Sequence, residues 1–221
     1  MLDLRLYLVT DRSYLAGRDF LAVLNAALRG GVTMVQLREK DASSRDFYDL
    51  AVRVRDLARG HGVPLWINDR LDIALAAGAD GLHVGQSDLP AAVARRLMPP
   101  AMKLGVSAQT VEQAVQAEQD GADCLGVGAM FPTGTKSDAR PVTADDLRRI
   151  KKAVRIPVVA IGGVTAGNLA LPMSCGADGV AVVSAIMAAP DPEAAARELR
   201  QAVDNSASPS SPVGKPFNPK A

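Results

Sequence analysis

The chain has 221 residues, which is enough for one domain or two small ones. Its 25 basic and 24 acidic residues give a formal net charge of +1, and only 4% of the residues are aromatic. This balance provides no bulk attraction to nucleic acid or to an anionic membrane. The scarcity of aromatic residues also argues against a stacking surface for single-stranded nucleic acid.

Compartment and partners follow from the same composition. No stretch reaches the roughly 18 uncharged apolar residues of a membrane span. Asp3 and Arg5 are charged where a signal peptide would be apolar. Cys124 and Cys175 lie in apolar sequence without metal-type spacing, which indicates two buried free thiols. We therefore expect a cytoplasmic protein with small-molecule ligands and with no nucleic-acid or membrane partner.

Short apolar runs alternate along the chain with segments of helical periodicity. Most runs are apolar throughout, as in parallel strands that are covered on both faces. The eight expected strands span residues 4–10, 34–38, 64–68, 81–84, 103–107, 124–128, 157–161 and 179–184. The expected helices span residues 19–29, 46–57, 71–77, 91–97, 111–119, 144–153, 167–175 and 192–203.

Gly-Ala-Asp recurs between helix and strand, at residues 78–80, 121–123 and 176–178. A glycine just past a helix can adopt the left-handed conformation that ends it. The eight expected strands, each followed by a helical segment, predict a single (β/α)8 TIM barrel over residues 1–204. The alternative is a doubly wound open sheet, but no Gly-x-Gly-x-x-Gly follows the first strand. Residues 205–221 hold four prolines and no apolar period, so we expect a disordered tail.

Polar side chains follow the strands at the end where such barrels build their active sites. Gln36, Arg38 and Lys40 alternate after the second strand, so an extended chain would carry them on one face. An amide, a guanidinium and an ammonium together suit a phosphate or diphosphate. The alternative is a solvated strand edge with an Arg–Glu pair.

Two carboxylates end neighbouring strands, namely Asp69 and Asp88. Mg²⁺ prefers one or two carboxylates together with phosphate oxygens and water, so the pair predicts a magnesium site. The alternative is that each aspartate caps the helix that follows it.

A second anion site is predicted at later strands. Thr133, Thr135 and Lys136 lie in a loop after the sixth strand, where hydroxyls and a lysine could surround an oxyanion. Gly163 and Ser184 follow the seventh and eighth strands, the usual phosphate site of these barrels. The alternatives are an ordinary loop and tight turns. Two anion sites at the same end of the barrel suggest a reaction that transfers a group between two phosphorylated ligands.

The remaining chemistry-bearing residues indicate no strong nucleophile. We expect structural roles for His61, in a turn, and for His83, inside a strand, and a core position for Trp66. The sequence shows no Ser-His-Asp set, no Cys-His pair and no histidine cluster for a metal.

Long motifs in these segments resemble the thiamine phosphate synthase family. They are LYLVTD (6–11), GVTMVQLREK (31–40), INDR (67–70), GLHVGQSD (81–88), GVS (105–107), FPTGTK (131–136) and AIGGV (160–164). The resemblance runs in order from about residue 4 to residue 203 and omits only the tail. It implies a (β/α)8 transferase that joins 4-amino-5-hydroxymethyl-2-methylpyrimidine diphosphate to a thiazole phosphate, giving thiamine phosphate and pyrophosphate.

The resemblance also implies roles for single residues. The pyrimidine diphosphate would be held by Gln36, Arg38, Lys40, Asn68, Ser107 and Lys136, and Mg²⁺ by Asp69 and Asp88. The thiazole phosphate would be held by Thr133, Thr135, Gly163, Val183 and Ser184. Arg38, Ser107 and Lys136 would be the catalytic residues. Pyrophosphate would leave first, and the thiazole nitrogen would then attack the pyrimidine cation.

The chain departs from the family pattern at two places. Gln109 stands where histidine is frequent, and Gly128-Ala129-Met130 stands where Gly-Pro-Ile is usual. Both departures bear on specificity. Two other activities on this barrel are a thiazole tautomerase, which would need a histidine in the loop after the sixth strand, and a phosphate-sugar isomerase. A non-catalytic phosphate-binding barrel is the third alternative. The sequence contains no indication of the oligomeric state.

Overall fold

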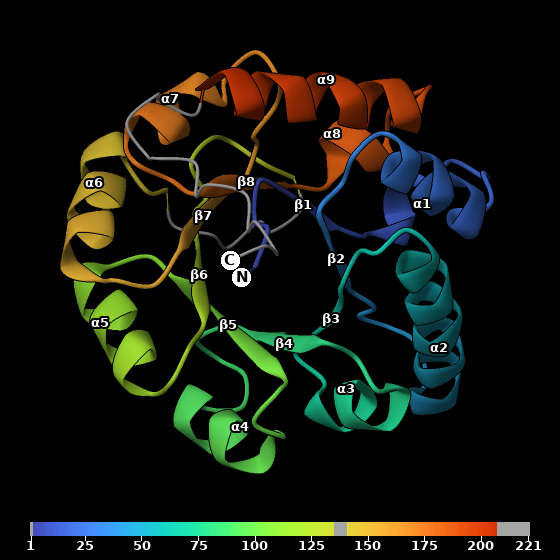
Figure 1. Ribbon diagram of the computed structural model, residues 1–221, viewed down its shortest axis with the longest axis horizontal. Helices are drawn as coiled ribbons and strands as arrows, with labels where there is room; N and C mark the ends of the chain where they lie inside the picture. The colour runs from blue at the N-terminus through green and yellow to red at the C-terminus, as the bar shows by residue number, and fades with distance from the viewer. Residues whose placement is uncertain (1, 135–140, 207–221) are drawn as a thin grey trace, which may run out of the picture.

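The computed structural model describes residues 2–134 and 141–206. Its eight strands are all parallel and follow one another around a closed barrel in chain order. Closure comes from β1, which pairs with both β2 and β8. The helices form a ring outside the barrel (Figure 1). The expected (β/α)8 barrel is therefore confirmed, and the doubly wound sheet is excluded.

The bounds of the strands agree with the apolar runs to within two residues. The strands are β1 (Leu6–Val9), β2 (Met34–Leu37), β3 (Leu65–Asn68), β4 (Gly81–Val84), β5 (Lys103–Ala108), β6 (Cys124–Val127), β7 (Val158–Ile161) and β8 (Gly179–Val182). The helices are η1 (Arg12–Tyr14), α1 (Phe20–Arg29), α2 (Ser44–Gly60), α3 (Leu71–Ala77), α4 (Ala91–Leu97), α5 (Val111–Gln119), α6 (Ala144–Ala153), α7 (Ala170–Ser174), α8 (Ser184–Met187) and α9 (Pro192–Ser206).

Four helices, α3 to α6, have the expected bounds, and the differences elsewhere have local causes. Helix α2 begins two residues earlier than expected because the Ser43 hydroxyl accepts the Asp46 N–H at 3.1 Å and caps it. Helix α7 is shorter than expected and contains Pro172, which has no N–H to donate. Helices η1 and α8 were not expected. Helix α9 continues through Ser206, and residues 207–221 of the expected tail lie outside the described part of the chain.

Two apolar layers make up the core. The larger lies between the barrel and its helices. The smaller fills the barrel interior and consists of Leu4, Tyr7, Val9, Met34, Trp66, Cys124, Val159 and Ala181. The expected core position of Trp66 and the two buried free thiols are confirmed.

Glycines on neighbouring strands make room for the rings inside the barrel. A Cβ atom on Gly81 would lie 2.4 Å from the Trp66 ring. A Cβ atom on Gly105 would lie 2.5 Å from His83 Nδ1. The Trp66 ring of β3 and the His83 ring of β4 can therefore pack inside the barrel.

Candidate active site

A cavity of about 400 Å³ opens at the carboxyl ends of the strands. All eight strands or the loops that follow them contribute to its lining. Nine of the predicted site residues line it: Gln36, Arg38, Asn68, Asp88, Ser107, Thr133, Gly163, Val183 and Ser184. The remaining predicted residues are Lys40 and Asp69, which lie elsewhere, and Thr135 and Lys136, which fall outside the described residues.

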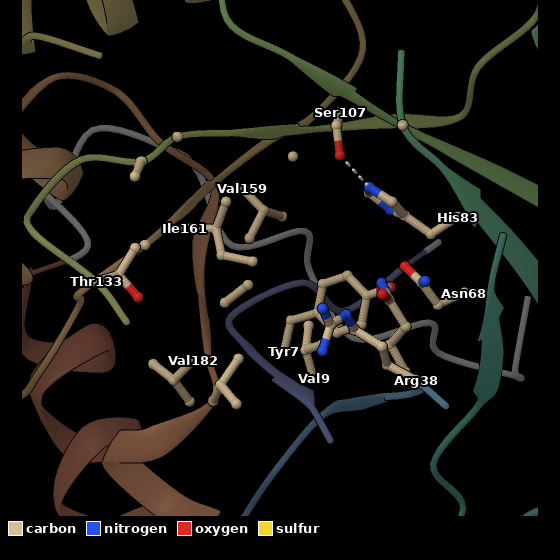
Figure 2. Close-up of a pocket in the computed structure, with 18 of the residues that line it drawn as sticks. Tyr7, Val9, Arg38, Asn68, His83, Ser107, Thr133, Val159, Ile161 and Val182 are labelled. Atoms are coloured by element: carbon tan, nitrogen blue, oxygen red, sulfur yellow. Dashed lines mark hydrogen bonds between the residues drawn. The ribbon is translucent and has the colours of Figure 1, made fainter. Parts of the chain in front are cut away.

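The cavity has two chemically different sides. Figure 2 shows Arg38 and Asn68 grouped near Tyr7, with His83 and Ser107 beyond them. Figure 2 also shows an apolar wall of Val159, Ile161 and Val182 on the opposite side. Such a space can hold a charged, hydrogen-bonding group beside an apolar ring.

Two buried polar side chains, in β2 and directly after it, are held by residues in β1 and in the turn that follows β1. Gln36 Nε2 donates to Tyr7 Oη at 2.6 Å, and Arg38 Nη1 donates to Asp11 Oδ2 at 2.8 Å. Burial raises the pKa of Tyr7 well above its ordinary value, so its hydroxyl stays protonated near neutral pH. The Arg38 side chain is only 7% exposed, which excludes the alternative of a solvated strand edge.

Thr10 and Asp11 hold Arg38 at both of its ends. Thr10 Oγ1 accepts the backbone N–H of Arg38 at 3.2 Å, while Asp11 binds the guanidinium. Asp11 also accepts hydrogen bonds from the N–H and the hydroxyl of Ser13. Burial raises the pKa of Asp11, but the Ser13 hydrogen bonds and the Arg38 charge outweigh it and hold that pKa below its ordinary value.

Lys40 does not line this cavity with Gln36 and Arg38, although the sequence predicts that the three share one face. Strand β2 ends at Leu37, and the alternation of side chains therefore stops before Lys40. Lys40 lines a second cavity, of about 820 Å³, together with Asp11, Arg12 and Glu39. Arg38 lines both cavities and so stands in the wall between them.

His83 lies at the cavity and not only in the strand. One of its ring nitrogens, Nε2, is 3.0 Å from Ser107 Oγ (Figure 2). The Tyr7 ring meets the His83 ring edge-on, with centroids 6.4 Å apart. Sequence reasoning assigned His83 a structural role. All four residues of β4 are buried, so the sequence carries no sign that His83 faces the barrel interior.

The two predicted metal ligands occupy different surroundings. Asp88 lines the cavity, and its Oδ2 accepts the Gly85 N–H at 2.7 Å. Asp69 lies next to Asn68 at the end of β3 in a left-handed conformation, with φ of 62°, and donates its N–H to the His83 carbonyl at 2.8 Å. The N-caps of α3 and α4 are Arg70 and Pro90, so neither aspartate caps the helix that follows it.

A pair of carboxylates is nevertheless a donor set that suits Mg²⁺. Asp69 and Asp88 are both half-buried and follow adjacent strands. Within residues 2–134 and 141–206, no cluster of three or more His, Cys, Asp or Glu side chains forms a closed metal site. A magnesium ion here would complete its shell with phosphate oxygens and water, which is the arrangement that it favours.

The apolar side of the cavity adjoins the loop after β6. A Cβ atom on Gly163 would lie 2.5 Å from the Pro132 carbonyl oxygen, so only glycine lets the two loops approach so closely. Gln109 Nε2 donates to the Gly128 carbonyl at 3.3 Å, and Ala129 lines the cavity beside it. Both departures from the family pattern therefore lie in the cavity wall. The apolar lining residues were missed because continuous apolar runs do not show which side chains face inward.

Comparisons with known proteins agree on one family. The sequence profile described as thiamine monophosphate synthase matches residues 6–186. The thiamine-phosphate synthase of Alkaliphilus oremlandii is 54% identical over 201 residues, covering 91% of this chain and 96% of its own. That of Chloroflexus aurantiacus is also 54% identical, over 204 residues that cover 92% and 94% of the two chains.

Solved structures extend the comparison to the fold. The thiamine phosphate pyrophosphorylase of Pyrococcus furiosus superposes with a TM-score of 0.86 at 40% identity, covering 93% of this chain and 98% of its own. A 3-hexulose-6-phosphate synthase superposes with a TM-score of 0.62 at 19% identity, covering 90% of this chain and 99% of its own. The second likeness shows the barrel alone. Across the described residues, no helix has the length and apolar character needed to cross a membrane.

Proposed function

Because the chain belongs to the thiamine monophosphate synthase family, we propose that it joins 4-amino-5-hydroxymethyl-2-methylpyrimidine diphosphate to 4-methyl-5-(2-phosphooxyethyl)thiazole. The products are thiamine phosphate and pyrophosphate, which makes the protein a transferase of thiamine biosynthesis. The observation that carries the proposal is the two-sided cavity, which pairs a cationic wall with an apolar one. Its partners would be small molecules, and a cytoplasmic location fits such an enzyme.

The pyrimidine diphosphate fits the polar side of the cavity. Arg38 is a buried cation with a fixed guanidinium, which suits bidentate binding of a diphosphate oxygen pair. Gln36 and Asn68 supply amide donors and acceptors next to it. Lys40 would reach the diphosphate from the second cavity, across the Arg38 wall. Ser107, hydrogen-bonded to His83, would contact the pyrimidine ring.

The thiazole phosphate fits the opposite side. Val159, Ile161 and Val182 offer an apolar surface for the thiazole ring. Thr133, Gly163, Val183 and Ser184 would bind its phosphate through hydroxyls and backbone N–H groups. Thr135 and Lys136 belong to the same loop as Thr133 by sequence, and we assign Thr135 to this phosphate and Lys136 to the diphosphate.

Asp69 and Asp88 are the residues that would hold Mg²⁺. The half-buried carboxylate of Asp88 stands at the cavity edge, and one of its oxygens is fixed by the Gly85 N–H. When bound, the ion would neutralise charge on the diphosphate oxygens and so make pyrophosphate a better leaving group.

The reaction needs no protein nucleophile. The bond between the pyrimidine methylene carbon and the diphosphate oxygen breaks, and its electron pair stays on the departing oxygen. The amino group of the pyrimidine ring stabilises the cation that remains. The thiazole nitrogen then donates its lone pair to that carbon and forms the new C–N bond. Arg38 and Lys136 would stabilise charge on the leaving group, and the loss of one such contact costs about 3–4 kcal/mol in barrier by analogy with oxyanion donors.

The test is a turnover assay. Purified protein is mixed with both substrates in Mg²⁺ or in EDTA, and thiamine phosphate and pyrophosphate are measured. We expect both products in equal amounts and only with Mg²⁺. Asp69→Ala and Asp88→Ala should nearly abolish turnover and leave the fold intact. Asp72→Ala, which removes an exposed carboxylate of α3 paired with Arg70, is the matched control and should retain activity.

Other outcomes would favour the alternatives. Binding of both ligands without product would indicate a non-catalytic phosphate-binding barrel, and Gln109 and Ala129 would be the first positions to revert. Isomerisation of the thiazole phosphate without condensation would indicate a tautomerase. Residues 128–136 contain no histidine for that reaction. Full activity of Asp88→Ala at limiting Mg²⁺ would remove the proposed metal role.

A further inference from the structure

We propose that Asp11 is a positioning residue that holds the Arg38 guanidinium in the orientation that binds the diphosphate. The inference rests on the proposed function, because it assigns Asp11 an effect only through Arg38. Asp11 comes from the turn after β1, and Arg38 directly follows β2. Neither the magnesium pair nor the thiazole side of the cavity involves Asp11.

Asp11 is itself rigidly held, which a positioning residue must be. Its Oδ1 accepts the Ser13 N–H at 3.0 Å and the Ser13 hydroxyl at 2.6 Å, so Asp11 is the N-cap of η1. Its other oxygen, Oδ2, is left to accept Arg38 Nη1 at 2.8 Å. The carboxylate therefore uses Oδ1 to bind Ser13 and Oδ2 to bind the Arg38 guanidinium.

The side on which Asp11 lies determines which donors Arg38 presents to the ligand. Asp11 lines the second cavity, whereas Arg38 lines both. Asp11 thus binds the guanidinium from the second cavity, whereas the diphosphate would bind it from the first cavity. A guanidinium carries five N–H donors in a fixed plane. The hydrogen bond from Nη1 to Asp11 restricts the rotation of that plane and leaves further donors for the ligand.

Burial makes this pair more than a surface contact. The side chains of Arg38 and Asp11 are 7% and 18% exposed. Thr10 Oγ1 fixes the backbone of Arg38 at the same time. Glu39, the next residue in the chain, pairs with Arg12 at 2.9 Å and not with Arg38. Asp11 and Arg12 therefore pair with Arg38 and Glu39, respectively, so each guanidinium has its own carboxylate.

The positioning role predicts an effect on one substrate only. Asp11→Ala removes the carboxylate, and Asp11→Asn keeps an acceptor oxygen without the charge. We expect kcat/KM for the pyrimidine diphosphate to fall about 10- to 100-fold in Asp11→Ala, as for other residues that orient a binding group, and less in Asp11→Asn. The KM for the thiazole phosphate should stay within about twofold, because no group on that side depends on Arg38.

Asp19→Ala is the matched control for the loss of a cap. Asp19 caps α1 by accepting the Ala22 N–H at 2.7 Å, in the same connection between β1 and α1. The control should lose the thermal stability that a helix cap provides but keep its kcat/KM for the pyrimidine diphosphate. An equal kinetic loss in Asp19→Ala would show that capping, and not the hold on Arg38, causes the effect.

A double-mutant cycle and a binding measurement complete the test. In an Arg38→Gln background, Asp11→Asn should cost nothing further, whereas additive losses would overturn the inference. Calorimetric binding of inorganic pyrophosphate should also weaken in Asp11→Asn. That readout needs no turnover, so it separates the two proposals. An inactive wild type with Asp11-dependent pyrophosphate binding would refute the reaction alone, and an active wild type with unchanged Asp11 variants would refute the positioning role alone.

Discussion

Removal of a single hydroxyl, in Tyr7→Phe, should weaken both the fold and the binding of the pyrimidine diphosphate. Tyr7 is 2% exposed, and its ring contacts the Trp66 and His83 rings edge-on, with centroids 6.1 and 6.4 Å away. The phenylalanine ring should therefore keep its place. The change then reduces to one lost acceptor, Oη, for Gln36 Nε2.

The size of the effect follows from the burial of Gln36, which is 4% exposed. A buried donor left without its acceptor costs about 1–3 kcal/mol. Gln36 lines the cavity, where water can replace the hydroxyl, so we expect the lower part, about 1–2 kcal/mol. For a chain of this size each kcal/mol lowers Tm by about 2–4 °C, which gives a loss of about 2–8 °C.

Thermal unfolding and steady-state kinetics measure the two consequences. The Gln36 amide should lose its fixed orientation, so KM for the pyrimidine diphosphate should rise roughly tenfold, equivalent to about 1.4 kcal/mol. Tyr48→Phe removes the same atom from a residue of α2 that is 37% exposed, and it should change stability by less than about 0.5 kcal/mol. A Tyr7→Phe protein that melts within 1 °C of the wild type would refute the reasoning, as would an equal loss in Tyr48→Phe.

Three further predictions concern the barrel interior and the end of the chain. Gly81→Ala should lower the free energy of unfolding by about 1–3 kcal/mol, because its Cβ would lie 2.4 Å from the buried Trp66 ring. Gly60→Ala is the control, since a Cβ there would have no atom within 4 Å, and it should not destabilise the protein. Urea unfolding of the two variants measures the difference. Burial and the nearby Asp123 charge raise the pKa of Cys124 from 9.0 to about 12, so the protonated thiol contributes stability that is complete below pH 9 and lost toward pH 12. Cys124→Ala should flatten the alkaline loss measured in urea, and an unchanged slope would contradict this. A chain that ends at Ser206 should keep its turnover rate and Tm, because residues 207–221 show no apolar period, and a loss of several degrees would oppose this expectation.

The barrel was predictable because its strands and helices carry strong and regular signals. Parallel strands are buried on both faces, so apolar runs such as Gly81–Val84 mark them directly. Helices of seven or more residues show their period, and α3 to α6 were predicted at their observed bounds. Helices η1 and α8 have three and four residues, too few for a period to appear.

Site residues could be predicted where a polar residue ends a strand. They could not be predicted where the local backbone conformation determines whether the side chain reaches the cavity. Arg38 and Ser107 could be identified from their position after an apolar run. The position of Lys40 outside the first cavity could not be predicted, because the sequence does not show that β2 stops at Leu37. Asp69 has a left-handed backbone, which period-two reasoning does not anticipate, so its separation from the cavity lining was not foreseen.

The pairing of β1 with β8 also has a consequence during synthesis. The first strand is complete at Val9, and its second neighbour ends only at Val182. At about 5–20 residues per second, a ribosome needs roughly ten to thirty seconds to make the sequence between them. Until then one edge of β1 has unpaired backbone N–H and C=O groups, a template for other chains. A high expression rate or a low chaperone concentration should therefore lower the folded yield of this protein more than that of a helical protein of equal length.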